Sequence, residues 1–100
     1  MLYAGLMTSP MSVRDIIVEK LARRFAPQRL EVVDDSRRHA GHAGARPGGE
    51  THFNVYIVSS AFYGKSRIER HRMVNATLSE ELAGGIHALA IRAESPDPAG

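Results

Sequence analysis

The sequence predicts a two-layer α+β domain in which helices cover one face of a three-stranded sheet. Two observations support this fold class. Apolar residues repeat at helical spacing in some segments and alternate as in half-buried strands in others. These segments follow one another in the order helix, strand, strand, helix, short helix, strand. The length of 100 residues suits a single domain with one modest core.

The composition is that of an ordinary globular chain, with 43% hydrophobic and 24% charged residues. No apolar run approaches the roughly 18 residues that a membrane span requires. The N-terminal residues place no cationic segment ahead of an apolar one, which is atypical of a signal peptide. We therefore expect a cytoplasmic protein that does not enter a membrane.

The chain contains no cysteine, so it cannot form a disulfide, a zinc–thiolate site or an iron–sulfur site of its own. Any cluster would need a partner that supplies the sulfur. The five histidines are the ordinary side chains that titrate near neutral pH and the available nitrogen ligands. They are His39, His42, His52, His71 and His87.

We divide the chain into a flexible tail over residues 1–11, a folded domain over 12–94 and a disordered tail over 95–100. Met7 and Met11 are both alternative starts of translation within the first tail. The folded domain therefore includes every segment with a clear helical or strand-like pattern.

A first helix is predicted directly after Ser12, because a hydroxyl followed three residues later by an acid, here Asp15, is typical of an N-cap. Ile16 and Phe25 lie at the margins of its buried stripe. Pro27 ends the helix, because proline lacks an N–H donor and restricts the residue before it. The stripe itself repeats every four residues, at Val13, Ile17 and Leu21.

A first strand is predicted over residues 30–36, with Leu30 and Val32 on one face. Asp34 and Asp35 close the strand. Neighbouring strand residues point to opposite faces, so the two carboxylates do not form a ready catalytic pair. Their expected role is solvation or capping at the end of the strand.

Residues 37–50 contain four glycines, one proline and no large apolar side chain, which predicts a mobile surface loop. Loops of this length in small domains are often functional. His39 and His42 lie three residues apart within it, but structural zinc takes four protein ligands and catalytic zinc takes three. Spacing alone therefore favours a flexible exposed loop over a metal site.

The clearest strand is predicted over residues 51–60, with His52 on its outer face. A last strand is predicted over residues 86–93. The residues expected to share the inner face of the first of these strands are Phe53, Val55 and Ile57. Those expected to share one face of the second are His87, Leu89 and Ile91.

Between these strands, residues 62–82 read FYGKSRIERHRMVNATLSEEL. Tyr63-Gly64 is typical of a turn, and a cation-rich helix follows it. His71 is expected to project toward the buried side as a packing residue. The apolar face is predicted to contain Ile68, Val74, Leu78 and Leu82. The residues placed off this face are Arg70, Arg72 and Met73.

The cation-rich helix is predicted to break near residues 75–77. Residues 77–80, Thr-Leu-Ser-Glu, resemble a second capping box from which a short helix starts. That helix ends at Gly84-Gly85, where glycine supports a left-handed C-cap.

The segment over residues 62–82 resembles the signature segment of the BolA family. The resemblance continues, in the same order along the chain, through three shorter motifs and covers about residues 13–94. Several motifs in order make it specific. The shorter motifs are Asp34-Asp35-Ser36, Gly49-Glu50-Thr51-His52-Phe53 and Gly84-Gly85-Ile86-His87-Ala88-Leu89.

This resemblance implies a type II KH-like fold with the order α-β-β-α-α-β. It also implies an adaptor that pairs with a monothiol glutaredoxin and shares a bridged 2Fe-2S cluster, in cluster assembly, trafficking and iron regulation. Proteins similar to this one take the thiolates from glutaredoxin and glutathione. The BolA partner contributes the histidine of the Ile-His-Ala segment, here His87, and one residue of the loop between the first two strands. That loop residue is His39 or His42, and the isolated chain binds no cluster.

The alternative hypothesis is a DNA-binding transcriptional regulator, as members of the family are widely described. The net charge of +2 is too small to indicate nucleic-acid binding by itself, but phosphate binding depends on where cations lie. Backbone amides at a helix start also favour anions. Arg67 stands where the Gly-x-x-Gly turn of a KH domain requires its second glycine. The candidate contacts to double-stranded DNA are Gly64, Lys65, Arg67, Arg70 and Arg72.

No nucleophile–base pair, carboxylate dyad or cofactor loop stands out, so we do not expect an enzyme. We prefer the adaptor hypothesis and keep the regulator as the alternative. The free chain is expected to be a monomer or a weak homodimer. The sequence leaves open which glutaredoxin it would bind, which DNA site it would read, and which loop histidine is the ligand.

Overall fold

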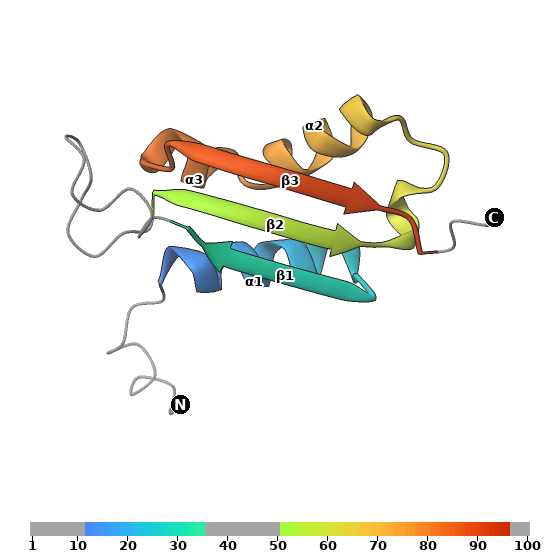
Figure 1. Ribbon diagram of the computed structural model, residues 1–100, viewed down its shortest axis with the longest axis horizontal. Coiled ribbons are helices and arrows are strands. Elements are labelled where there is room, and N and C mark those ends of the chain that lie inside the picture. Colours follow the sequence, from blue (N-terminus) through green and yellow to red (C-terminus); the bar gives the residue numbers. More distant parts are fainter. Residues whose placement is uncertain (1–11, 36–50, 97–100) are drawn as a thin grey trace, which may run out of the picture.

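The computed structural model describes residues 12–35 and 51–96 and shows a three-stranded sheet with helices packed against it (Figure 1). The predicted order of elements is confirmed, and a short 3-10 turn is added to it. In chain order the elements are α1 (Val13–Phe25), β1 (Arg29–Asp34), β2 (His52–Val58), η3 (Ser60–Phe62), α2 (Arg67–Thr77), α3 (Ser79–Gly84) and β3 (Ala88–Glu94).

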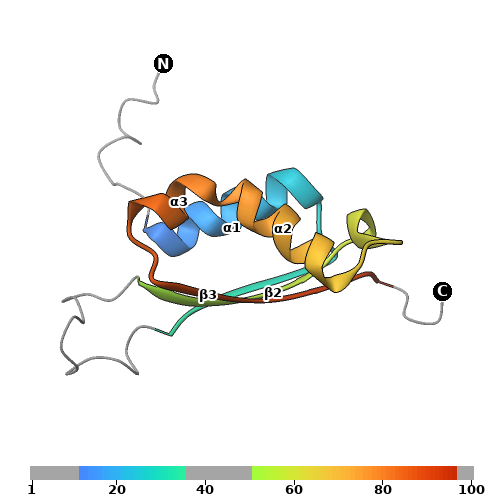
Figure 2. The ribbon, with the colours of Figure 1, turned by 90° about the horizontal axis from the view of Figure 1, so that it is seen from above.

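The strands lie in the order β1-β2-β3. β1 pairs antiparallel with β2, whereas β2 pairs parallel with β3, so that Phe53 lies beside Leu89. A parallel pair requires a crossover connection, and here α2 and α3 provide it. Figure 2 shows that α1, α2 and α3 all lie on the same side of the sheet. The predicted two-layer α+β architecture is therefore confirmed.

The core lies between the sheet and the three helices, and the helical and strand patterns read from the sequence together account for most of it. The three inner residues predicted for β2 are all buried, and Val32 of β1 joins them. Phe25, expected at the margin of the α1 stripe, belongs to the core itself. The complete set of buried apolar residues is Ile17, Leu21, Phe25, Val32, Phe53, Val55, Ile57, Phe62, Val74, Leu78 and Ile86.

Helix α1 begins and ends where the sequence predicts. The Ser12 hydroxyl accepts the Asp15 backbone N–H at 3.1 Å, which is the expected N-cap. At the other end Ala26 takes a left-handed conformation with φ 43°, and its N–H donates to the Ala22 carbonyl at 3.0 Å. Pro27 follows directly and prevents another helical turn.

Ser59 joins the end of β2 to the end of α1. It is fully buried, and its hydroxyl donates to the Phe25 carbonyl at 2.7 Å while accepting the Ala61 N–H at 3.1 Å. The ring of Phe62 then packs against that of Phe25, with centroids 5.0 Å apart. β2 consequently ends at Val58, two residues earlier than predicted.

The buried face of α2 differs from the prediction at its first turn. Ile68 is 63% exposed, while Met73, placed off the face, packs against the core. At about 3.6 residues per turn, a spacing of six residues leaves Ile68 about a third of a turn away from Val74. The predictions of Val74 and Leu78 as buried residues are correct.

The helix break is real, but its capping differs from the prediction. α2 ends at Thr77, whose hydroxyl donates to the Met73 carbonyl at 2.8 Å, and α3 has no side-chain N-cap. The predicted capping box at residues 77–80 is therefore wrong. Gly85, with φ 142°, ends α3 as expected for glycine. β3 begins at Ala88, two residues later than predicted.

No helix in the described ranges 12–35 and 51–96 is long and apolar enough to cross a membrane. The cytoplasmic location and the proposed division into domain and tails stay predictions. Residues 1–11 and 97–100, which include most of both predicted tails, lie outside the described residues.

Replacing Leu78 by Ala should lower the free energy of unfolding by about 2–5 kcal/mol, because it leaves a cavity in the core. Replacing Ile68 by Ala should change it by less than about 0.5 kcal/mol, because that side chain is largely exposed. Urea unfolding followed by circular dichroism measures both values. Equal losses for the two variants would contradict this assignment of the buried face.

Candidate functional site

His87 lies exposed at the point where the chain enters β3. Its backbone N–H donates to the Thr51 carbonyl at 2.7 Å, and the N–H of Ala88 donates to the same oxygen at 3.2 Å. The start of β3 is thereby fixed beside the start of β2, at one end of the sheet (Figure 1). The backbone of His87 is anchored while its side chain faces solvent.

A second histidine lies at the same end of the sheet. The rings of His52 and His87 are 5.9 Å apart between centroids and meet edge to face at 82°. The Nδ1 atom of His52 is 2.9 Å from the Oγ1 atom of Thr51, a residue that is only 4% exposed. The predicted placement of His52 on the outer face of β2 is correct, but its contact with His87 was not predicted.

The predicted loop ligands His39 and His42 lie outside the described residues. The flanks of their segment are described: the Asp35 backbone N–H donates to the His52 carbonyl at 2.8 Å. Both flanks of residues 36–50 are therefore at the same end of the sheet as His87.

The potential metal donors described at this end are the imidazoles of His52 and His87 and the carboxylates of Asp34 and Asp35. Across the described ranges, no three His, Cys, Asp or Glu side chains gather as a closed metal site would require. Since the chain also has no cysteine, it can offer nitrogen ligands but not the thiolates of an iron–sulfur cluster. These residues fit a metal group whose other ligands come from a partner.

The predicted DNA contacts lie around the start of α2. Gly64 forms the turn with φ 73°, and Arg72 is exposed on the helix. A groove of about 620 Å³ runs between α2 and β3. It is lined by Lys65, Arg67, Arg70, His71, Ile91, Arg92, Ala93 and Glu94. The structure therefore brings three of the predicted cations into one groove and leaves Arg72 outside it.

Arg70 is engaged inside the protein. Its Nε donates to the Lys65 carbonyl at 3.0 Å and its Nη1 donates to the Ala93 carbonyl at 3.1 Å. The guanidinium thus ties the turn before α2 to the end of β3. This use of Arg70 explains its half-buried position and reduces its availability to a phosphate.

The start of α2 carries its own carboxylate. The Ser66 hydroxyl accepts the Glu69 N–H at 3.1 Å, and the Glu69 carboxylate accepts the Ser66 N–H at 2.7 Å, which completes a capping box. Donation by the Ser66 backbone N–H holds the pKa of the Glu69 carboxyl below its ordinary value, against a smaller opposing effect of burial. The expected anion-binding amides are therefore partly occupied by Glu69.

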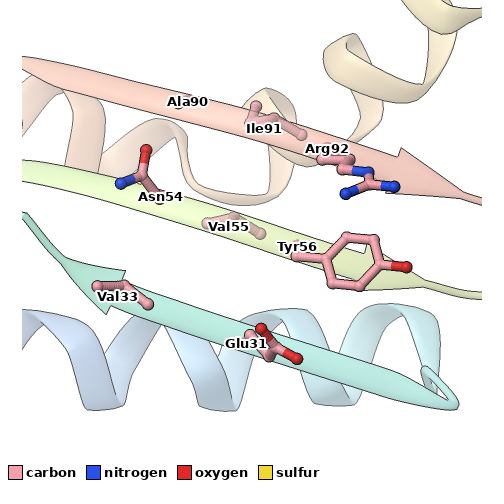
Figure 3. A pocket seen from close by; sticks show the side chains of 8 residues that line it. All are labelled: Glu31, Val33, Asn54, Val55, Tyr56, Ala90, Ile91 and Arg92. Atoms are coloured by element: carbon pink, nitrogen blue, oxygen red, sulfur yellow. The ribbon is translucent and has the colours of Figure 1, made fainter.

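The uncovered face of the sheet holds a shallow hollow of about 290 Å³ (Figure 3). The guanidinium groups of Arg29 and Arg92 approach the ring of Tyr56, at 5.0 and 4.7 Å from its centroid. Arg29 also pairs with Glu31 at 2.6 Å, and Arg92 pairs with Glu94 at 2.9 Å. This face is consequently balanced in charge and does not form a cationic surface.

The sequence profile of the family described as BolA-like protein matches residues 21–98. The chain belongs to this family. Its sequence is 50% identical to BolA-like protein 1 of Bos taurus over 84 residues, which cover 84% of this chain and 59% of that protein. It is 48% identical to the DNA-binding transcriptional regulator BolA of Escherichia coli over 81 residues, which cover 81% of this chain and 73% of the regulator.

Solved structures agree with this membership. The BolA domain of SufE1 from Arabidopsis thaliana superposes with a TM-score of 0.77 at 48% identity, over 88% of this BolA-like chain and 96% of that domain. The solution structure of BolA1 from Mus musculus gives a TM-score of 0.71 at 44% identity, over 87% of this chain and 68% of that one. The predicted family and fold are both confirmed.

Several curated relatives are longer than the domain that they share with this BolA-like chain. The chain spans 59% of bovine BolA-like protein 1 and 23% of the SufE-like protein 1 of Arabidopsis thaliana, with which it is 51% identical. The names of these relatives designate no enzyme. The expectation that this chain is not an enzyme stays a prediction.

Replacing Arg70 by Ala should lower the free energy of unfolding by about 1–2 kcal/mol, because two carbonyls lose a charged donor. Replacing Arg67, an exposed residue of the same helix, by Ala should change the free energy of unfolding by less than about 0.5 kcal/mol. Guanidinium unfolding of both variants compares them directly. If Arg70 were a free surface cation, its variant would be as stable as the Arg67 variant.

Proposed function

We propose that this BolA-like protein is an adaptor that contributes His87 as a nitrogen ligand to a 2Fe-2S cluster shared with a monothiol glutaredoxin and glutathione. One observation carries the proposal. His87 presents an exposed imidazole from an anchored backbone, in a chain that has no cysteine. Such a chain can complete a cluster only when a partner brings the thiolates.

The chemistry of the site supports a complex in which the partner supplies the thiolates and this chain supplies an imidazole. When imidazole replaces thiolate on one iron of a 2Fe-2S cluster, the reduction potential rises. The two backbone hydrogen bonds to the Thr51 carbonyl hold the Cα atom of His87 in place without occupying its ring. A ligand whose backbone is held in this way loses little backbone conformational freedom when it binds a partner's cluster.

A second ligand is proposed from residues 36–50, either His39 or His42. The support is the position of the flanking residues Asp35 and Thr51, which lie at the same end of the sheet as His87. The proposed role is cluster assembly or trafficking and iron regulation in the cytoplasm. The isolated chain is proposed to be a monomer or weak homodimer without a bound cluster.

Reconstitution of a 2Fe-2S cluster from iron and sulfide on a monothiol glutaredoxin with glutathione tests this function. Adding the protein should change the visible circular dichroism of the cluster and yield a one-to-one complex. Replacing His87 by Ala should weaken cluster capture at least about tenfold, because one ligand is lost. The matched control is His71→Ala, which removes a histidine from the groove between α2 and β3.

The result is decisive in either direction. A loss specific to the His87 variant supports the adaptor function with His87 as ligand. A spectrum that the protein does not change, or an identical spectrum and affinity with and without the His87 imidazole, would refute it.

A second candidate function is DNA binding through the groove between α2 and β3. The exposed cations Lys65 and Arg67 line this groove, and Arg72 lies on the same helix. The Escherichia coli relative, 48% identical, is named a DNA-binding transcriptional regulator. The engaged guanidinium of Arg70 and the carboxylate of Glu69 both weaken this candidate relative to the first.

If these cations contact phosphates, binding to double-stranded DNA should weaken as salt rises. Replacing Lys65, Arg67 and Arg72 together by Ala should reduce the slope of log affinity against log salt by about two to three, because each lost contact accounts for about 0.9. The control is Arg23→Ala on α1, where the side chain is 79% exposed. An unchanged slope in the triple variant, measured by fluorescence anisotropy, would exclude this surface.

A further inference from the structure

Two imidazoles from different strands meet at one end of the sheet. Parallel pairing puts His52 of β2 beside Ala88 of β3, so the preceding residue, His87, comes next to the ring of His52. The two rings make an edge-to-face contact, with centroids 5.9 Å apart and planes at 82°. Aromatic rings favour this arrangement, which restricts how far each can rotate.

The two histidines differ in how firmly they are held. His52 is half-buried, and its Nδ1 lies 2.9 Å from the hydroxyl oxygen of buried Thr51. Its carbonyl also accepts the Asp35 N–H at 2.8 Å, so β1 fixes it from the other side. His87 is exposed and is anchored through its backbone. The firmly held ring of His52 is therefore in a position to orient the ring of His87.

His87 is exposed and His52 is only partly buried. The edge-to-face contact therefore lies at the surface, beside the imidazole that the proposed function uses. Orienting a ligand before its metal group arrives lowers the entropy lost on binding, and groups that contact a ligand commonly do this in metal sites.

We propose that His52 is the positioning residue of this site: its ring holds the His87 imidazole in the orientation that accepts a partner's cluster. The role given to this orientation rests on the proposed adaptor function. The ring contact itself is present in the free protein. His52 acts through His87 and is not itself a ligand. The chain thus supplies its nitrogen ligand already oriented.

The first test uses the free, isotopically labelled protein and needs no cluster. Three-bond couplings measured by NMR give the side-chain rotamer populations of His87 in the wild type, in His52→Ala and in His52→Phe. The wild type and the Phe variant, which keeps a ring at position 52, should each show one dominant rotamer. The Ala variant should show averaging between rotamers, with backbone amide shifts unchanged away from the site.

If His87 keeps the same single rotamer in His52→Ala, the positioning role is wrong. This outcome is independent of glutaredoxin, so it differs from a failure of the proposed function. A wild-type protein that captures no cluster would instead refute the adaptor function, while the rotamer comparison would still decide the role of His52.

The second test follows cluster capture from a monothiol glutaredoxin with glutathione. His52→Ala should reduce the affinity about tenfold and alter the visible circular dichroism, whereas His52→Phe should remain within about twofold of the wild type. If the Phe variant is as impaired as the Ala variant, then a nitrogen of His52 is required. That result would overturn positioning by the ring contact.

Discussion

The parallel pairing of β2 with β3 determines both the path of the chain through α2 and α3 and the position of the candidate site. At its start, the Thr51 carbonyl accepts two backbone N–H groups, from His87 and Ala88, and so fixes the register of the pair. A parallel pair requires a crossover, which α2 and α3 provide on the same face that α1 covers. The same pairing brings His52 and His87, which are distant in the sequence, together at one end of the sheet, where the proposed function places the shared cluster.

The cationic residues divide between holding the fold and facing solvent. Arg70 ties the turn before α2 to the end of β3, and Arg92 pairs with Glu94 along its own strand. Lys20 bridges α1 to α3 through Glu80 and Glu81, at 2.8 and 2.7 Å. Lys65, Arg67 and Arg72 remain exposed. A cation-rich segment therefore contains fewer phosphate-binding candidates than its composition indicates, and for this reason the histidine end of the sheet is the stronger functional candidate.

Periodicity and capping chemistry predicted most of the fold, because they are local properties. The inner face of β2, the N-cap at Ser12 and the glycine end of α3 were all read correctly. Ile68 was misplaced because its spacing to Val74 is not a whole number of helical turns. The internal role of Arg70 and the contact between His52 and His87 depend on tertiary pairing, which periodicity does not encode. The family resemblance identifies His87 as the proposed ligand, whereas its contact with His52 is visible only in the structure.

The proposed function requires that an imidazole of this chain binds iron, and nitrogen hyperfine spectroscopy tests this requirement most directly. The protein would be labelled with ¹⁵N-histidine, combined with an unlabelled monothiol glutaredoxin carrying its cluster and glutathione, and reduced to the paramagnetic state. The proposed function predicts ¹⁵N couplings of the size expected for coordinated imidazoles, and the coupling from His87 should be lost in His87→Ala while that from the loop histidine remains. A spectrum without ¹⁵N coupling, or one that the His87 substitution leaves unchanged, would contradict it.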